Sequence, residues 1–174
     1  MARIRLLEKN EVDPIAKEIY QRVEDSGLKI ANIFKAEAHS PKLLRDITLM
    51  GLTLLTECKL NPRLRELAIL RVGDLLQSSY EWAQHAPHAL KVGASQEQID
   101  ALPEWANSDR FDSQERDVLQ YTDEMTKDIR VSDDTFARLT YFLSEEEIVE
   151  LTVTVGYYAM ICRMLEALEI ELEI

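Results

Sequence analysis

Residues 61–85, NPRLRELAILRVGDLLQSSYEWAQH, decide the fold that we expect for this chain. Asn61 precedes Pro62, and this pair is a helix start signal, because the asparagine side chain accepts an orphan backbone amide and proline suits the first helical position. The apolar pattern that follows predicts a helix over residues 62–77, and a second helix is predicted over residues 79–91. Two consecutive helices joined by a tight junction are therefore expected.

Comparable start signals recur outside this stretch. They lie at Asp13-Pro14, Ser40-Pro41, Asp112-Ser113 and Ser132-Asp133, and at the capping boxes Ser95 to Gln98 and Ser144 to Glu147. The chain holds only five glycines, and no run alternates polar with apolar residues long enough to compete as a strand. The prediction is an all-α protein with helices near residues 12–25, 29–38, 41–57, 62–77, 79–91, 96–102, 113–128, 133–142 and 145–168.

Length and charge bound what the chain can be. Its 174 residues fit one domain, residues 1–174, with enough chain to bury a core without disulfides. A net charge of −12 disfavours nucleic-acid and membrane partners, because it repels phosphates and anionic lipid surfaces. Cys58 and Cys162 form neither a CxxC nor a zinc spacing, and no secretory segment opens the chain. We therefore expect a cytoplasmic protein with free thiols.

The last predicted helix is apolar around its whole circumference. Its run from Val153 to Cys162 is interrupted only by Thr154 and Gly156. Such a surface has to be enclosed, and the run is too short to cross a membrane. Its cover is then this chain or a neighbouring one, which motivates the expectation of a homo-oligomer.

Glu66, Glu81 and His85 are the candidate catalytic residues. Glu66 falls on the line of Ile69 and Leu70, so its carboxylate points along an apolar side of its helix, where it needs a partner. Glu81 and His85 are four residues apart and share one helix face. A partly desolvated carboxyl group and an imidazole can titrate in the same pH range, so the set could act as acid and base.

Structural interpretations of the same residues stay open. Ser78 to Glu81 is itself an S-x-x-E capping box, so Glu81 could only hold the start of its helix. Glu66 could pair with Arg63 or Arg163.

Other side chains near these residues give weaker signals. His88 suggests a metal pair with His85, but Pro87 lies between them and the only other histidine is the distant His39, so no metal site is expected. Four aromatic side chains could line a pocket, although aromatics at helical spacing more often belong to the core: Tyr80, Trp82, Tyr157 and Tyr158.

These motifs together resemble a known family. LRELAILRV, a short junction, YEWAQH, a turn at Gly93 and then SQEQI resemble the carboxymuconolactone decarboxylase domain, and VGYYAMICRMLEAL is similar to the last helix of that family. The resemblance covers residues 30–170 and extends to the alkylhydroperoxidase-D-like proteins. It implies a compact orthogonal bundle of helices, assembled into trimers or hexamers with sites near the protomer contacts.

The resemblance also separates this chain from its peroxidase relatives. Those relatives carry E-x11-C-x2-C-x3-H, whereas here the frame is Glu66-x11-Ser78-x2-Glu81-x3-His85. A hydroxyl group and a carboxylate cannot form a disulfide or a sulfenic acid, so the peroxidase cycle cannot run at these positions. The decarboxylases of the family tend to have Glu-x3-His here, which Glu81 and His85 match, and they generally lack the upstream Glu66.

We expect a lyase or isomerase that needs no metal or cofactor and acts on a small organic acid, lactone or carbonyl compound. Glu66 would orient His85, His85 would move the proton, and Glu81 would be its partner. The substrate-binding candidates are Ser78, Tyr80 and Tyr158, and an anionic substrate would also need a cation, for which Arg71 and Arg163 are candidates.

Two alternatives remain from the sequence. One is a peroxiredoxin-like antioxidant activity through Cys58 or Cys162, which the apolar surroundings of Cys162 disfavour. The other is a non-catalytic oligomer that binds a small ligand or a protein.

Overall fold

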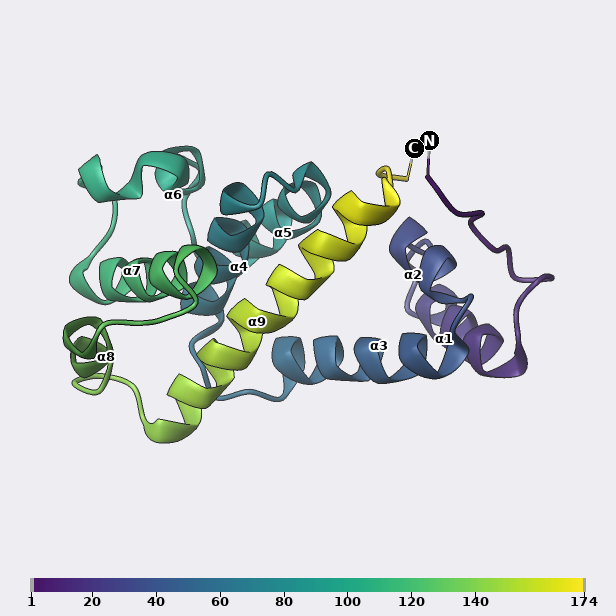
Figure 1. The fold of residues 1–174 in the computed structure, drawn as a ribbon, viewed down its shortest axis with the longest axis horizontal. Coiled ribbons are helices and arrows are strands. Elements are labelled where there is room, and N and C mark those ends of the chain that lie inside the picture. The colour runs from purple at the N-terminus through teal and green to yellow at the C-terminus, as the bar shows by residue number, and fades with distance from the viewer. Residues whose placement is uncertain (1, 174) are drawn as a thin grey trace. The chain divides into compact units, whose positions relative to one another are not determined.

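A computed structural model of the chain describes residues 2–173, and the secondary structure of this part is entirely helical (Figure 1). The all-α prediction is confirmed. The elements are α1 Pro14–Asp25, α2 Asn32–Glu37, α3 Pro41–Thr56, α4 Pro62–Leu75, α5 Ser79–Lys91, α6 Gln96–Ala101, the 3-10 helix η1 Leu102–Asn107, α7 Ser113–Lys127, α8 Asp133–Leu139 and α9 Glu145–Leu168.

The predicted helix starts hold because their capping side chains form the expected bonds. Asp13 and Asn61 accept from the amides of Ile15 and Arg63, each ahead of a proline. Capping boxes close at Ser95 with Gln98 and at Asp112 with Glu115. Residues 144–147 form reciprocal bonds of the same kind. Each bond satisfies an amide that would otherwise have no partner in the first helical turn.

The largest differences from the sequence prediction are at three helices that are shorter than expected and at one element that was not expected. The helix predicted over residues 62–77 ends at Leu75, because Gln77 takes a left-handed conformation with φ of 56°. The helices predicted over residues 29–38 and 133–142 are shorter, at Asn32–Glu37 and Asp133–Leu139. The 3-10 helix η1 was not predicted.

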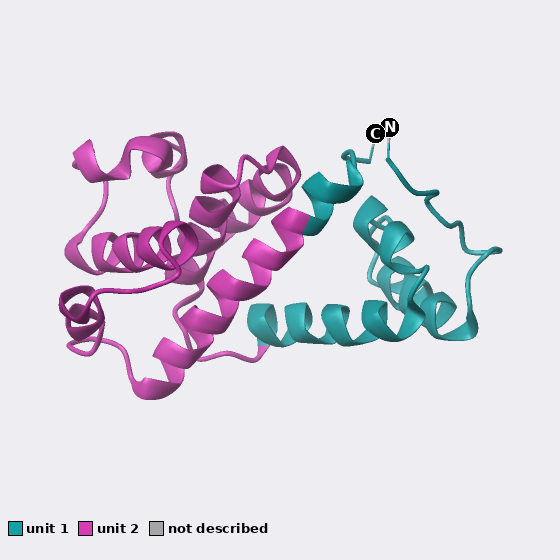
Figure 2. Cartoon of the chain, in the orientation of Figure 1, with its two compact units in different colours: residues 1–56, 164–174 teal, residues 57–163 magenta. Residues whose placement is uncertain are grey.

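The described residues fall into two compact units (Figure 2). In the first, residues 1–56 with 164–174, a small core gathers Leu7, Ala16, Ile19, Tyr20, Ala38 and Leu44. The Tyr20 hydroxyl donates to the carbonyl of Leu7 over 3.0 Å, which ties the segment before α1 to that helix. This unit therefore has a core of its own.

The second unit, residues 57–163, is built around α4. Every residue of α4 from Leu64 to Gly73 is buried, and α5 and α7 pack against the helix. One hydrophobic core cluster of this unit comprises Leu67, Leu70, Ala89, Ala94, Ile99, Leu102, Trp105, Phe111 and Leu119. Polar side chains on α4 consequently have to find partners inside the protein.

Helix α9 is only partly covered within the chain. Leu151, Val155 and Cys162 are buried, whereas Val149 and Val153 are 60% and 41% exposed. By length and composition α9 would qualify as a membrane span, but half of its most apolar window is buried, as in the core helices of soluble proteins that meet the same criterion. The expectation that α9 is enclosed is thus met on one of its faces.

Candidate active site

The junction between α4 and α5 brings the two helices close together. The amide of Ser78 donates to the carbonyl of Gly73 over 2.8 Å, and the left-handed Gln77 reverses the chain between them. A Cβ atom placed on Gly73 would lie 3.5 Å from the Cβ of Glu81. Because the helices approach this closely, side chains of α4 reach those of α5 directly.

His85 on α5 lies between two carboxyl groups, one from each helix. Its Nδ1 is 2.8 Å from Oε2 of Glu66, and its Nε2 is 3.5 Å from Oε2 of Glu81. All three residues are buried, with Glu66 only 1% exposed. The structure thus brings together the three residues that the sequence selected as catalytic candidates.

Arg65 completes the set, and the sequence analysis did not select it. Both Nε and an Nη of its guanidinium donate to Oε1 of Glu66, over 3.4 and 3.3 Å. Glu66 thus pairs with an arginine, but not with either of the two that the sequence left open as partners, since Arg63 binds Glu115 and Arg163 donates to a carbonyl one turn earlier in α9. Because Arg65 neutralises Glu66 on one oxygen, the other oxygen is left to accept from Nδ1 of His85.

Burial sets the proton affinity of Glu81. Desolvation raises the pKa of this carboxyl group above its ordinary value, and Glu66 raises it further, while His85 acts in the opposite direction. A carboxyl group with a raised pKa holds its proton to higher pH than an ordinary surface glutamate, which suits it to act as a proton donor. An acid and an imidazole are therefore neighbours in this site.

Tyr158 of α9 covers the imidazole. Its ring meets that of His85 edge to face, with centroids 4.8 Å apart, and it packs in the same manner against Tyr157. Burial, Glu81 and Glu66 raise the pKa of the Tyr158 hydroxyl, so it stays protonated. Of the three predicted substrate-binding residues, Tyr158 is the one with a ring contact to His85.

Ser78 and Tyr80 are both buried at the start of α5. The Ser78 hydroxyl is enclosed without a hydrogen-bond partner in the chain and makes no helix-capping bond, so the capping-box interpretation of Ser78 is wrong. The backbone of Ser78 is extended, with ψ of 94°, whereas the two serine and aspartate caps that close capping boxes have ψ of 159° at Ser95 and 176° at Asp112. An enclosed hydroxyl group without a partner is an available hydrogen-bonding group.

The remaining candidates lie in other environments. Trp82 packs against the core of the second unit, so it is structural. Arg71 is held by Asp123 and Asp74 over 2.6 Å each, and it also donates to the carbonyl of Pro103. This guanidinium is fully engaged in joining α4 to α7 and η1, so it does not serve a substrate in the site.

The cysteines have surroundings that suppress thiol chemistry. Burial and the neighbouring Glu150 raise the pKa of the Cys58 thiol, and Cys162 is completely buried. The thiolate is the reactive form, and reactive cysteines have lowered pKa values. Neither cysteine therefore has the features of a redox centre.

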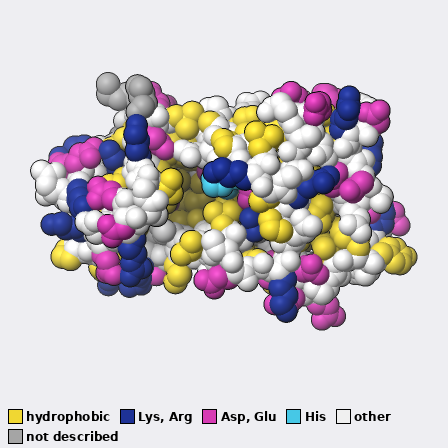
Figure 3. Space-filling model, turned by 180° about the vertical axis from the view of Figure 1, so that it is seen from behind, with side chains coloured by type: hydrophobic (Ala, Val, Ile, Leu, Met, Phe, Trp, Pro, Cys, Tyr) yellow, Lys and Arg dark blue, Asp and Glu magenta, His cyan; other side chains and the backbone are white. Residues whose placement is uncertain are grey.

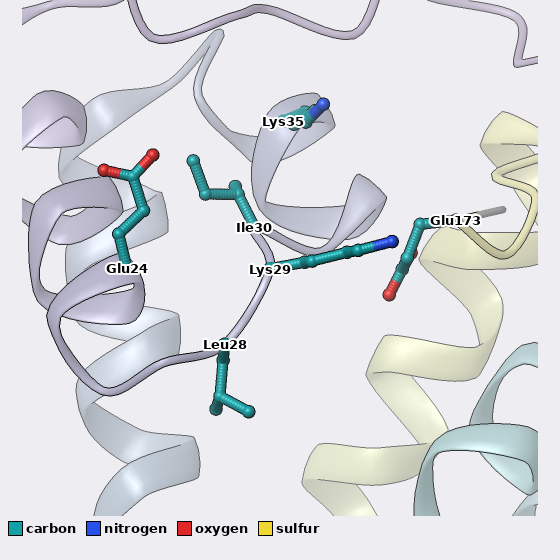
Figure 4. Close-up of a pocket in the computed structure, with 6 residues that line it drawn as sticks. All are labelled: Glu24, Leu28, Lys29, Ile30, Lys35 and Glu173. Carbon is teal, nitrogen blue, oxygen red and sulfur yellow. The ribbon is translucent and has the colours of Figure 1, made fainter.

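A surface pocket of about 400 Å³ lies within the first unit, and none of the residues named above lines it (Figure 4). Lys29 extends towards Glu173 across it. The other charged groups of its lining are engaged, since Lys35 pairs with Glu8, Glu24 with Lys9, and Glu173 accepts from the amide of Asn32. It offers no acid and base poised together.

Figure 3 shows one face of the molecule, on which a histidine side chain reaches the surface beside hydrophobic side chains and a basic one. Within residues 2–173, no group of three or more histidine, cysteine, aspartate or glutamate side chains is arranged to hold a metal ion. The groups available for chemistry around His85 are the carboxyl groups of Glu66 and Glu81, the imidazole itself and the Ser78 hydroxyl.

The helical core and the carboxylate–imidazole pair at the junction of α4 and α5 lie within a part of the chain that matches a known family. Residues 41–124 match the model of the carboxymuconolactone decarboxylase family, a range that includes Glu66, Glu81 and His85. This part of the chain is similar to that family, in agreement with the resemblance that the sequence indicated. Tyr158 lies outside the matched range.

Solved structures share the fold. An uncharacterized peroxidase-related protein from Ralstonia eutropha JMP134, described as an alkylhydroperoxidase AhpD core, aligns with a TM-score of 0.86 at 16% identity, covering 99% of this chain and 92% of that one. A peroxidase-related protein from Silicibacter sp. TM1040 aligns with 0.83 at 17% identity, with coverages of 99% and 92%. A variant of the debrominase Bmp8 in complex with 2,3,4-tribromopyrrole aligns with 0.75 at 16% identity, with coverages of 99% and 94%. No curated protein matches the chain.

Proposed function

We propose that the chain is an acid–base lyase or isomerase that acts on a small lactone or carbonyl compound at His85. The observation that carries this proposal is the position of the imidazole, with Nδ1 2.8 Å from Glu66 and Nε2 3.5 Å from Glu81. Glu66 accepts the Nδ1 hydrogen and fixes the tautomer, so Nε2 is the nitrogen that exchanges a proton with substrate.

Glu81 is the acid in this scheme. Because its pKa is raised, the carboxyl group of Glu81 is suited to donate a proton to the substrate oxygen while Nε2 of His85 takes one from carbon. The two transfers together convert a carbonyl compound into its enol. Return of the proton from His85 to a different carbon of a conjugated enol, with the enol hydroxyl giving its proton back to Glu81, completes an isomerisation. The Ser78 hydroxyl, enclosed and without a partner, is suited to donate to the same oxygen.

The charges favour an uncharged substrate over a carboxylate. Arg65 is engaged by Glu66, and Arg71 by Asp123 and Asp74. Arg163 donates to a backbone carbonyl of its own helix. A carboxylate substrate would enter beside two carboxyl groups with these guanidinium groups already bound, and burying an unpaired charge is costly. We therefore narrow the expected substrates to neutral lactones and carbonyl compounds.

Exchange of carbon-bound hydrogen tests the proposal without knowledge of the natural substrate. A panel of neutral lactones and ketones in D2O would be followed by proton NMR, with and without the protein. We expect exchange next to the carbonyl group of at least one compound, and a loss of about 10²-fold or more in His85→Ala. His39→Ala is the matched control, because His39 is exposed and bonds only a backbone carbonyl in the first unit. Equal exchange in wild type and His85→Ala would refute the proposal.

We also propose that the protein assembles with copies of itself as a trimer or hexamer. Val149, Val153 and Met160 leave an apolar row on α9 that the chain itself does not cover, and association would bury it. Sedimentation as a monomer at micromolar concentration would contradict this proposal.

A further inference from the structure

His85 is poorly connected to solvent through the groups that hold it. Its side chain is 10% exposed, and those of Glu66 and Glu81 are 1% and 6% exposed. The exchange of carbon-bound hydrogen with solvent that we propose above nevertheless requires this site to trade protons with water. A route from the imidazole to the surface is therefore required.

His88 provides an exposed titratable group next to this buried imidazole. It lies three residues further along α5, where residues share a helix face, and its side chain is exposed. The ring centroids of His85 and His88 are 5.7 Å apart, and the planes are tilted by 41°. Two imidazole rings at this separation leave space for one water molecule to bridge a nitrogen of each ring, and a bridging water passes protons between them.

We propose that His88 relays protons between His85 and solvent. The inference rests on the proposed acid–base function, since only such chemistry uses the route. A proton leaving Nε2 of His85 binds the unprotonated nitrogen of His88, and the proton on the other nitrogen of His88 passes to water. No electron moves, and the reverse order delivers a proton from water to His85.

The surroundings of His88 suit this role. Partial desolvation by neighbouring atoms lowers the pKa of the His88 imidazole, although the residue reaches solvent. The charges of His85, Lys91 and Arg65 lower this pKa further, whereas Glu66 raises it. A lowered pKa keeps the ring neutral at pH 7, with one nitrogen protonated and one free. A ring that is permanently charged could donate a proton but not accept one.

The relay can be tested in the resting protein, apart from any turnover. Proton-exchange rates between the His85 ring and water would be measured by NMR on protein labelled with 15N-histidine, in wild type, His88→Gln and the control His39→Gln. We expect His88→Gln to slow exchange at His85 by roughly tenfold. Free imidazole added to the buffer should restore the rate, and His39→Gln should leave it unchanged.

The outcomes separate the relay from the proposed function. An unchanged exchange rate at His85 in His88→Gln would overturn the relay, even if His85-dependent exchange of substrate hydrogen were observed. Slowed exchange with imidazole rescue would support the relay, even if no compound of the panel reacted. His88→Ala is a second variant that removes the imidazole. Because position 88 is exposed, we expect both variants to fold, and equal slowing in the two would then reflect loss of the imidazole.

Discussion

The Nδ1 atom of His85 lies 2.8 Å from the carboxylate of Glu66, and this bond joins α5 to the buried face of α4. The same carboxylate is bonded by Arg65, so a single glutamate holds both a guanidinium and an imidazole. The sequence separates Glu66 from His85 by 19 positions, and the tight junction at Ser78 brings them together. Two kinds of consequence follow, one for stability and one for the tautomer of the ring.

Glu66→Leu should destabilise the protein by about 3–5 kcal/mol, because it leaves the buried guanidinium of Arg65 without its anion. Arg65→Met combined with Glu66→Leu should recover much of the loss, since no unpaired charge then remains. Urea unfolding of the two single variants and the double variant measures the coupling. If the losses in the free energy of unfolding were additive, the Arg65–Glu66 contact would contribute no coupling energy to stability.

The tautomer of His85 should depend on an acceptor at position 66. Glu66→Gln keeps an oxygen for the Nδ1 hydrogen, whereas Glu66→Leu removes it. We expect 15N chemical shifts to report the Nδ1-protonated ring in wild type and in Glu66→Gln, and a mixture of tautomers in Glu66→Leu. A mixture already present in wild type would contradict the role of Glu66 as the orienting group.

The stability of the first unit should decrease with rising pH through Glu37. Both oxygens of this buried carboxyl group lack hydrogen-bond partners, and burial raises the pKa of Glu37 to about 8. The folded state thus holds a proton that the unfolded chain releases near its ordinary pKa of 4.5, so stability is present at low pH and is lost as pH rises from 4.5 to about 8.

Replacing Glu37 should remove this loss. Glu37→Met should raise the free energy of unfolding by roughly 2–4 kcal/mol at pH 8 and change it little at pH 4. Denaturant unfolding at both pH values measures the difference, and Glu18→Met, at an exposed position of α1, is the control. An equal effect of Glu37→Met at the two pH values would show that the carboxyl group does not titrate in this range.

The sequence predicted the three central residues of the site but not the arginine that pairs with one of them, and the reason is physical. Glu66, Glu81 and His85 were selected from helical spacing and from the resemblance to the family's frame, which works because α4 and α5 are consecutive and their junction is short. The partner Arg65 was missed because α4 carries other arginines at similar spacing, and only the packing against neighbouring helices decides which one meets Glu66.

The same distinction explains the fold. Caps such as Asp112 and Ser95 are local, so their helices were placed closely. The 3-10 helix η1 was missed because its carbonyls at Leu102 and Pro103 accept from Arg71, which lies far away in the sequence. Local signals fix where helices begin, whereas distant polar contacts fix the irregular segments.

Arg71 should matter for stability and not for substrate. Its guanidinium binds Asp123 and Asp74 and is almost fully buried, so Arg71→Met leaves Asp74 without its cation and Asp123 with Lys127 alone. We expect a loss of about 3 kcal/mol in the free energy of unfolding. Where the variant is folded, the His85–Glu66 bond should persist in NMR spectra. A stable Arg71→Met protein that no longer catalysed the exchange of substrate hydrogen would instead show that Arg71 takes part in the active site.

The two thiols should be slow to react, and this separates the acid–base proposal from a redox one. Burial and Glu150 raise the pKa of Cys58, so little thiolate is present at pH 7, and Cys162 is enclosed in the core. Alkylation of the native protein at pH 7 should therefore proceed at least about tenfold more slowly than that of the urea-unfolded chain, with mass spectrometry assigning the modified residue. The Cys58→Ser and Cys162→Ser variants should keep all hydrogen exchange that depends on His85. Rapid alkylation of Cys58, together with hydroperoxide consumption that Cys58→Ser abolishes, would favour a thiol peroxidase and count against His85 as the centre of the chemistry.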